Sequence, residues 1–395
     1  MKVKILPSAI LAVLATFAFA SPRPATHSGQ AVNAPAQHQS VVVNIEVPVR
    51  VLKKDAFVGG LTLQDFEVYE DGVRQSIEAV YLIKDKRILR EEKAVASAPP
   101  PPQSARHFVL YLDLNEYLPR IGTALDFFFT EVIKPGDTLN VVTPAKSYRF
   151  KSEALSRFSG QQIADNLKAK LRVDVQFGNS QYRNLMKDFY SLEQTEFPPE
   201  QADLKEQMLF DIAAQIRDLT EITEKKVADF AETLKSLDGD KHVFLFLQKD
   251  VLPEHAFEAE KQAELIKPVG FDVEKIARIF SDASITVHFL YITKKPDFAV
   301  DTSSVGRPSL AFSQQDVSAD IYASFKEIAR STGGLTESTA NPHSALRHAA
   351  EASSHYYLLY YKPNAYRADG GFRKIEVRVK EKGLQVFHRA GYIAD

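Results

Sequence analysis

An apolar run that ends in an acidic residue is the part of this chain best placed to do chemistry. Residues 108–113 read FVLYLD, so a strand-like segment ends at Asp113, and a helix-like stretch starts at Ile121. In a sheet whose strands alternate with helices, ligands bind in the crevice outside the carboxyl ends of the strands. The segment therefore predicts that Asp113 borders a ligand site. The structural alternative is that Asp113 caps the next helix or pairs with a nearby cation.

The sequence carries no familiar catalytic signature. It has no G-x-S-x-G elbow, P-loop or dinucleotide fingerprint, so no nucleophile, phosphate cradle or cofactor turn is indicated. Zinc sites need clustered ligands, and an H-E-x-x-H or comparable spacing is missing around His242, His255, His288, His343, His348 and His355. We therefore expect no catalytic residue. Acids that are distant in the chain can still meet in space, so a hydrolase stays open as an alternative.

The elements that must position Asp113 follow an alternating order. Strand-like runs cover residues 108–112, 138–143, 242–247 and 286–292, and helical patterns cover 121–132, 273–280 and 321–331. Strands that alternate with helices favour a mainly parallel sheet covered on both faces. The sequence thus predicts an α/β domain over residues 107–355.

A long helical segment is expected inside this domain, over residues 199–238. Its apolar positions fall mostly at spacings of three and four, which is typical of one amphipathic helix or of two in succession. We expect the apolar stripe to pack onto the sheet. A partner-binding face is the alternative.

Two β-rich segments flank the α/β domain. Period-two alternation and turn residues predict strands within 41–86, and a second group within 356–395. Each group alone is a marginal sheet, because one apolar face stays uncovered. We expect the two to form one β-sandwich into which the α/β domain is inserted. Residues 87–106 contain Pro99 to Pro102 and are expected to be an extended linker, or alternatively a proline-rich ligand for another domain.

The N-terminus has the features of a secretory signal. Lys2 and Lys4 precede an apolar stretch that ends in Ala18-Phe19-Ala20, so cleavage is expected after residue 20. A membrane anchor is the alternative, but the apolar run is shorter than the roughly 20 residues that span a bilayer. Residues 21–40 are poor in large apolar side chains and are expected to be a flexible leader. We expect a secreted or periplasmic protein.

Length and composition restrict the remaining possibilities. A chain of 395 residues with 45% hydrophobic content is expected to form two or three globular domains. The chain has 49 basic and 51 acidic residues, so it has no global field that attracts nucleic acid, and we expect no nucleic-acid partner. Without cysteine it forms no disulfide and has no thiol for a lipid anchor. No later segment is apolar enough to be an integral membrane span.

Three segments together resemble the von Willebrand factor A-like proteins known mostly from acidobacteria. Residues 60–72 (GLTLQDFEVYEDG) resemble that family's G-L-T-x-x-D-F-x-V-x-E-D-G signature, and residues 237–242 (LDGDKH) resemble its L-x-G-x-K junction before the central strand. Residues 356–361, 372–377 and 389–392 resemble its closing pattern. The resemblance covers most of the chain after the signal segment. It implies a Rossmann-type α/β domain of the von Willebrand factor A kind.

The resemblance also implies a divalent-metal site. The family gathers a cation such as Mg²⁺ from a first-strand D-x-S-x-S loop, a threonine in a later loop and an aspartate after the central strand. Asp113 matches the loop aspartate, whereas Asn115 and Tyr117 replace the serines. Ser180 is the candidate for the threonine, and Asp250 for the later aspartate, although Lys249 precedes it. These departures predict a degenerate site at Asp113, Asn115, Ser180 and Asp250.

These observations combine into one expectation of function. We expect an exported, non-catalytic protein-binding or scaffold module, built on a von Willebrand factor A-like domain with a degenerate metal site. The alternatives are a divalent-cation-dependent adhesion domain and the hydrolase mentioned above. No cofactor is expected, although Mg²⁺ or another divalent cation is possible for the adhesion reading, and the protein partner is unknown.

Overall fold

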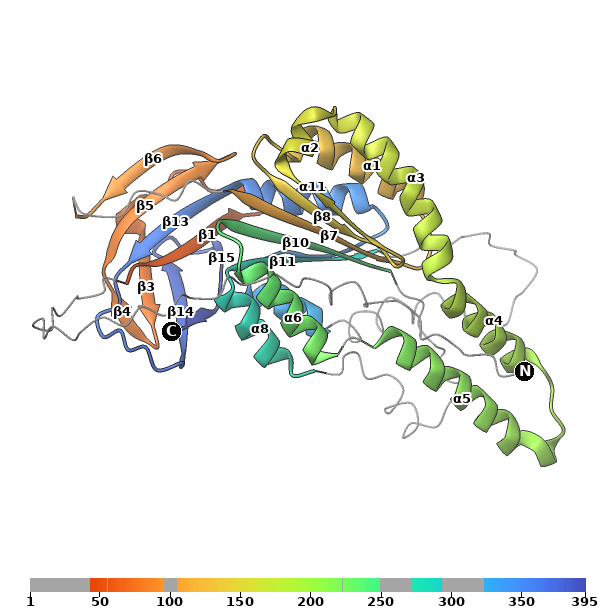
Figure 1. Ribbon diagram of the computed structural model, residues 1–395. Coiled ribbons are helices and arrows are strands. Elements are labelled where there is room, and N and C mark those ends of the chain that lie inside the picture. Colours follow the sequence, from red (N-terminus) through yellow and green to blue (C-terminus); the bar gives the residue numbers. More distant parts are fainter. Residues whose placement is uncertain (1–42, 55, 96–104, 222, 249–270, 293–322) are drawn as a thin grey trace, which may run out of the picture.

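Two bodies make up the described protein, an α/β unit and a β-sandwich beside it (Figure 1). The computed structural model describes residues 43–54, 56–95, 105–221, 223–248, 271–292 and 323–395. The expected signal peptide (1–20) and leader (21–40), Pro99 to Pro102, and Asp250 lie outside the described residues.

The α/β unit is built on one mixed sheet. Its strands are β7 (Arg106–Leu114), β8 (Thr138–Val142), β9 (Ser147–Phe150), β10 (Asp240–Gln248), β11 (Ile285–Ile292) and β12 (Thr336–Thr339). They lie in the order β12-β11-β10-β7-β8-β9, with β9 antiparallel to β8 and the other neighbours parallel. Counted along the chain from β7, the order is 3-2-1-4-5-6, which is that of a doubly wound sheet.

Helices cover both faces of this sheet, as the alternating pattern predicted. On one face, α1 (Pro119–Phe127) with its π-helical extension Phe128–Val132, α3 (Gly160–Gly178) and α11 (Pro342–Ser354) bury one set of strand side chains. On the other face, α6 (Glu224–Lys235), α8 (Val273–Asp282) and α10 (Ala323–Ser331) bury the alternate set. A short helix, α2 (Ser152–Arg157), precedes α3.

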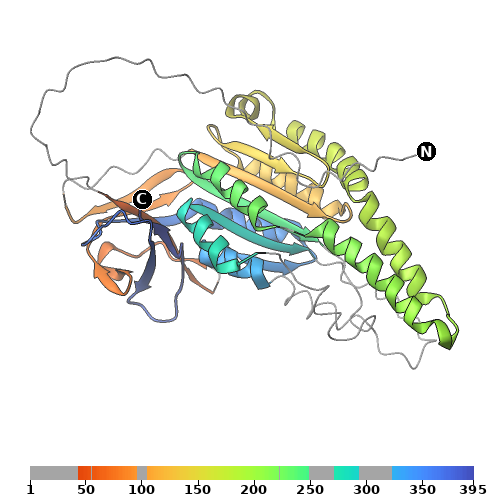
Figure 2. The ribbon, with the colours of Figure 1, turned by 60° about the horizontal axis from the view of Figure 1, so that its bottom comes forward.

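A helical hairpin projects from the α/β unit beyond the sheet (Figures 1 and 2). It consists of α4 (Ser180–Gln194), the 3-10 turn Pro199–Gln201 and α5 (Ala202–Thr220), which share a small core around Phe189 and Leu209. The segment expected over residues 199–238 is therefore two helices, of which α6 packs onto the sheet and α5 packs onto α4. The expected packing of the whole stripe onto the sheet is wrong for α5, because α4 supplies a nearer apolar surface.

The flanking β segments form two sheets with a common core. The first has the order β15-β1-β13-β5-β6, with β2 beside β1, and the second has the order β16-β14-β3-β4. The N-terminal strands are β1 (Ile45–Lys53), β2 (Ala56–Phe57), β3 (Phe66–Glu70), β4 (Val73–Gln75), β5 (Ile77–Lys84) and β6 (Arg87–Lys93). The C-terminal strands are β13 (His355–Tyr361), β14 (Phe372–Val379), β15 (Gln385–His388) and β16 (Gly391–Ile393). Val47, Tyr357 and Val377, from both segments, belong to one buried cluster between the sheets.

The linker expected over residues 87–106 begins later than the sequence indicated. Arg87–Lys93 is strand β6, which pairs antiparallel with β5 at the edge of the first sheet. Asp85 and Lys86 form the connecting turn with positive φ angles of 47° and 66°. Edge strands tolerate charged residues, which protect them from pairing with other chains. The charges that suggested a linker are therefore compatible with this strand.

Gly239, in the segment that resembles the family's junction, has a steric role. Helix α6 ends at Lys235, so Gly239 lies in the turn before β10. It has a φ of +101°, and a Cβ added there would lie 2.1 Å from the carbonyl oxygen of Ala105. That glycine lets β10 approach β7 at the start of the two central strands.

Candidate functional site

The strand order places a topological switch point between β7 and β10. Chain connections run toward β8 on one side of this pair and toward β11 on the other. Ligands of doubly wound sheets bind outside the carboxyl ends of the two strands at such a point. Here those ends are Leu114 and Gln248, which face each other in the parallel register. We call this end of the sheet the carboxyl edge.

Asp113 lies at the carboxyl edge, one residue before the end of β7. Its side chain is half-buried. Burial and the negative charge of Asp113 together raise the pKa of Tyr111, two residues earlier on the strand. Asp113 thus supplies negative charge at the switch point.

Two neutral amide side chains lie at the loop that follows β7, one in the loop and one at the end of β10. Asn115 and Gln248 are both buried, with 3% and 2% of their surface exposed. The backbone N–H of Glu116 donates to the Gln248 side-chain oxygen at 3.2 Å, which ties the loop after β7 to the end of β10. Two buried, neutral amides therefore occupy positions where negatively charged side chains would favour the binding of a cation.

The junction of α3 and α4 reaches the same loop. Asn179 is buried and donates from Nδ2 to the carbonyl oxygens of Leu114 at 2.5 Å and Val175 at 3.1 Å. A Cβ at Gly178 would lie 2.6 Å from the carbonyl carbon of Pro144, so α3 ends against the loop after β8. The exposed Ser180 hydroxyl donates to the carbonyl of Phe177 at 2.8 Å. The structure thus brings the neighbourhood of Ser180 to Asn115, while Asp250 lies outside the described residues.

Tyr117, at the position of the second serine in the family's loop, packs away among the helices. Its ring lies against the cluster under α1 and α3, and the Arg172 guanidinium stacks on it at 4.9 Å from the centroid. The hydroxyl would be 2.8 Å from a Cβ added at Gly122 in α1. Tyr117 therefore serves packing.

These side chains fit a divalent cation poorly. Hard cations need several oxygen ligands, and carboxylates give the negative charge that offsets dehydration. Arg183 extends from α4 to the carbonyl oxygens of Asn115 at 3.5 Å and Val175 at 3.2 Å, so a fixed positive charge lies beside the loop. Over the described ranges, no group of three or more His, Cys, Asp or Glu could hold a metal ion. The four-residue metal site stays a prediction, which this donor set does not favour.

Three residues of this edge escaped the sequence reasoning. Asn179 and Gln248 adjoin predicted positions, but nothing in their local pattern indicates burial of their amides. Arg183 is an exposed residue of α4. Its contact with the Asn115 carbonyl depends on the orientation of α4 relative to α3. Only the tertiary arrangement identifies it.

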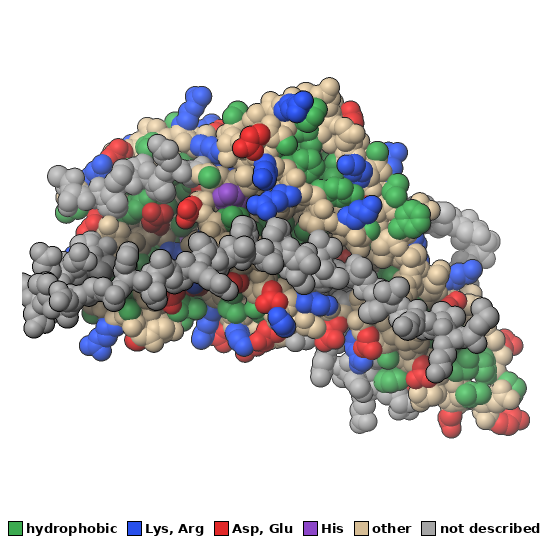
Figure 3. All heavy atoms as spheres, in the orientation of Figure 1, with side chains coloured by type: hydrophobic (Ala, Val, Ile, Leu, Met, Phe, Trp, Pro, Cys, Tyr) green, Lys and Arg blue, Asp and Glu red, His purple; other side chains and the backbone are tan. Residues whose placement is uncertain are grey.

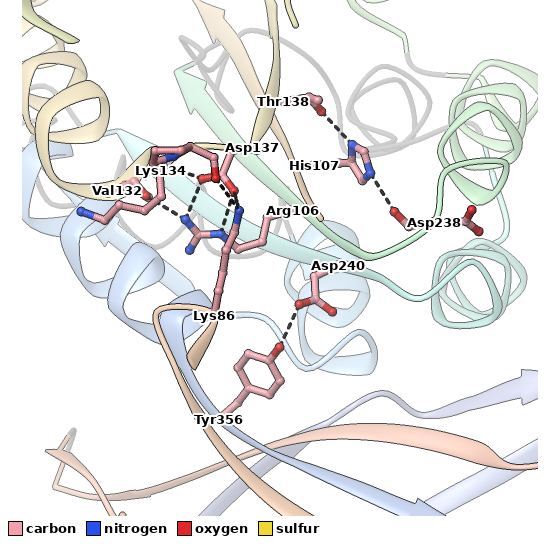
Figure 4. Close-up of polar contacts among 11 residues, drawn as sticks. Lys86, Arg106, His107, Val132, Lys134, Asp137, Thr138, Asp238, Asp240 and Tyr356 are labelled. Atoms are coloured by element: carbon pink, nitrogen blue, oxygen red, sulfur yellow. Dashed lines mark hydrogen bonds and ion pairs between the residues drawn. The ribbon is translucent and has the colours of Figure 1, made fainter. Parts of the chain in front are cut away.

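A second polar cluster lies at the opposite end of the sheet, which we call the amino edge (Figure 4). Arg106 at the start of β7 donates to both carboxylate oxygens of Asp137, at 3.2 and 2.7 Å, and Lys86 of the sandwich also pairs with Asp137. His107 is held between Thr138 Oγ1 at 2.7 Å and the carbonyl of Asp238 at 2.8 Å. These contacts join the two bodies and leave Asp137 fully enclosed.

Neither sign of charge dominates the face of the protein shown in Figure 3. Acidic and basic side chains are interspersed over the face shown in Figure 3. This agrees with the formal net charge of −2. Among the helices that the structure describes, none has the length and apolarity to cross a bilayer.

Comparisons with known proteins give only a distant structural similarity. No protein-family model matches the chain, and no curated protein matches it. The structure is similar to the crystal structure of the human COPII-coat protein Sec24c, with a TM-score of 0.32 and 8% sequence identity. That similarity covers 74% of this chain and 44% of the Sec24c chain. The described fold is α/β with mixed sheets, and no family is assigned by these comparisons.

Proposed function

We propose that this protein is an exported, non-catalytic protein-binding module built on a von Willebrand factor A-like domain whose metal loop is altered. One observation carries the proposal: the loop after β7 lies at the switch point of a doubly wound sheet. Buried amides and a guanidinium border it there. A site of this polarity recognises hydrogen-bonding and acidic groups of a partner more readily than it holds a cation.

Exposed apolar side chains beside this loop support a protein partner. Val173 and Phe177 lie four residues apart on α3, and 49% and 70% of their surfaces are exposed. Side chains spaced by four residues share one face of a helix. Phe177 immediately precedes the junction that contacts Leu114. Aromatic side chains surrounded by polar groups are typical anchors of protein interfaces.

Metal titration separates this proposal from the cation-dependent adhesion alternative. Isothermal titration of the purified protein with MgCl₂, MnCl₂ and CaCl₂ should give no saturable binding tighter than about 1 mM. The adhesion alternative predicts binding that disappears in Asp113→Ala and persists in Asp203→Ala, a matched change on the exposed start of α5. Saturable binding with this pattern would overturn the proposal of an altered, metal-independent site.

Partner capture tests the surface itself. The protein is cross-linked to extracytoplasmic proteins of its source cells, with either EDTA or Mg²⁺ present, and the products are identified by mass spectrometry. A specific product should form equally under both conditions, and Val173→Asp/Phe177→Asp should abolish it. The control is Val73→Asp on the sandwich, where 59% of Val73 is exposed. Capture that is unaffected by the double substitution would refute this surface, and turnover in a hydrolase screen would favour the enzyme alternative.

A further inference from the structure

A cavity of about 420 Å³ lies between the two bodies at the amino edge of the sheet. Its walls come from β1, from the starts of β10 and β11, from the turn after α10 at Thr332 and Gly333, and from β13 and β15. It is separate from the switch point, because it lies at the other end of β10. A volume of this size accommodates a small organic molecule.

Three cationic side chains line the cavity without a carboxylate partner. Arg50 donates to the carbonyl of Gly333 at 3.0 Å, and the Lys241 ammonium donates to the carbonyl of Ala283 at 3.1 Å. Arg389 donates to Ser284 Oγ and to the carbonyl of Glu46, both at 2.7 Å. Within the described part of the chain, none of the three forms a salt bridge, and the Nε atoms of Arg50 and Arg389 have no hydrogen-bond partner.

Both arginines adjoin the turn at Thr332 and Gly333, one through its backbone and the other through its side chain. Arg389 forms a β-bridge with Thr332, and Arg50 contacts the next residue, Gly333. Arg50 is only 5% exposed and its guanidinium also lies 5.0 Å from the centroid of the Phe387 ring. A buried guanidinium without a counter-charge is costly, because its hydration is lost and no ion pair replaces it. A bound anion would supply that counter-charge.

Three carboxylates line the cavity, and two of them accept hydrogen bonds from tyrosines. The negative charge of the third, Asp238, favours the charged form of Lys241. Asp240 accepts a hydrogen bond from the Tyr356 hydroxyl at 2.8 Å, which Figure 4 shows, and Glu46 accepts one from Tyr360 at 3.0 Å. Burial raises the pKa of both Glu46 and Asp240, which weakens their ability to neutralise the cations. The exposed Lys235, which also lines the cavity, pairs with Asp282 and Asp395. Among the described residues, the buried Arg50 guanidinium therefore has no carboxylate in contact with it.

We propose that this cavity binds a small molecule through an oxyanion group, a carboxylate or a phosphate, held by Arg50 and Arg389. Arginine presents a planar fork of N–H donors that suits both groups. Lys241 adds a third positive charge. Because residues of both bodies line the cavity, the bound anion would connect the sandwich to the α/β unit.

Titration of the purified protein with three probes tests the proposal: inorganic phosphate, citrate and succinate, each against NaCl of matched ionic strength. We expect at least one probe to bind in isothermal titration and to raise the melting temperature, since a ligand of the folded state stabilises it. Binding of phosphate alone identifies a phosphate ligand, and binding of citrate or succinate identifies a carboxylate. The proposal is overturned if no probe exceeds the NaCl control.

Substitutions locate the site. Arg50→Gln and Arg389→Gln should each weaken binding at least tenfold, whereas Arg378→Gln should not, because Arg378 forms an exposed pair with Glu376 on β14. Without a probe, Arg50→Gln should melt no lower than the unsubstituted protein, because an uncompensated buried charge is removed. Binding that is unchanged in both cavity variants would place the anion elsewhere. If a variant fails to fold, the titration of the unsubstituted protein against the NaCl control still tests whether the anion binds.

Discussion

Buried histidines are the residues that most directly link this protein's stability to pH. His242 and His288 lie on neighbouring strands with their rings 6.0 Å apart, and His242 also stacks on Phe108. Burial, with smaller contributions from the positive charges of Arg106 and Arg50, lowers the pKa of His242 from 6.5 to about 3. Burial likewise holds the pKa of His288 well below its usual value. Both rings are therefore neutral in the folded protein near neutral pH.

The sign of the resulting pH dependence follows from proton uptake. Below pH 6.5 the unfolded chain protonates these histidines while the folded chain does not, until the pH approaches the folded value of about 3 for His242. Each neutral ring therefore contributes its full stabilising free energy above pH 6.5, the pKa of histidine in the unfolded chain. This contribution decreases as the pH falls below that value. The slope is at most about 1.4 kcal/mol per pH unit for each histidine.

Replacement of His242 isolates one of these contributions. His242→Phe keeps an aromatic ring against Phe108 and removes the titrating group. The loss of unfolding free energy between about pH 7.5 and pH 5.5 should be smaller than in the unsubstituted protein by about 1.4 kcal/mol. Urea denaturation at both pH values measures it. His348→Phe, at an exposed position, is the control, and an unchanged slope in His242→Phe would contradict the assignment.

At the scale of elements, the junction between α3 and α4 holds the carboxyl-edge loop in place. The Asn179 side chain connects Leu114 at the end of β7 with Val175 in the last turns of α3. Buried carbonyl groups that lose a donor remain unsatisfied, which costs more than the net value of a hydrogen bond. The amide is thus a structural requirement of the proposed partner surface.

Asn179→Ala should lower the free energy of unfolding by about 1–3 kcal/mol. Amide hydrogen exchange should accelerate in residues 114–117, because the loop loses its connection to α3. Asn166→Ala supplies the matched control, since the exposed Asn166 side chain donates only to the carbonyl of Gln162 within α3, at 2.9 Å. Its effect should stay within about 0.5 kcal/mol. Equal effects of the two substitutions would show that the junction does not hold the loop.

At the scale of the whole molecule, the sandwich depends on strands from both ends of the described chain. Strand β13 lies between β1 and β5, and β14 lies between β3 and β16. Removal of residues 355–395 therefore takes two strands from each sheet, β13 and β15 from the first and β14 and β16 from the second. An isolated pair of strands is marginal in water.

The truncated chain should consequently lose hydrogen-exchange protection throughout β1, β3 and β5. Strands β7 and β10 pair with each other and provide the comparison within the same sample. They should keep substantially more protection than β1, because both faces of their sheet remain covered by helices. Protection of the N-terminal strands equal to that in the full chain would refute the interdependence of the two segments.

Local sequence patterns were sufficient to predict the class of the α/β unit and the positions of most strands. Apolar runs at residues 242–247 and 286–292 became β10 and β11, and the helical patterns near residues 273 and 321 became α8 and α10. Such patterns are readable because the period of the apolar residues matches the local geometry of the element that buries them. Asp113 followed from the same reasoning, since it lies one residue before the end of a buried strand.

Contacts between distant segments could not be predicted from local patterns and are seen in the folded protein. The place of β13 between β1 and β5, the amide cluster of Asn115, Asn179 and Gln248, and the cavity between Arg50 and Arg389 all join residues far apart in the chain. Edge strand β6 and hairpin helix α4 were missed because charged surface positions weaken a local apolar pattern. A local pattern records which face of an element is buried, whereas the identity of the surface that buries it depends on the complete packing of the chain.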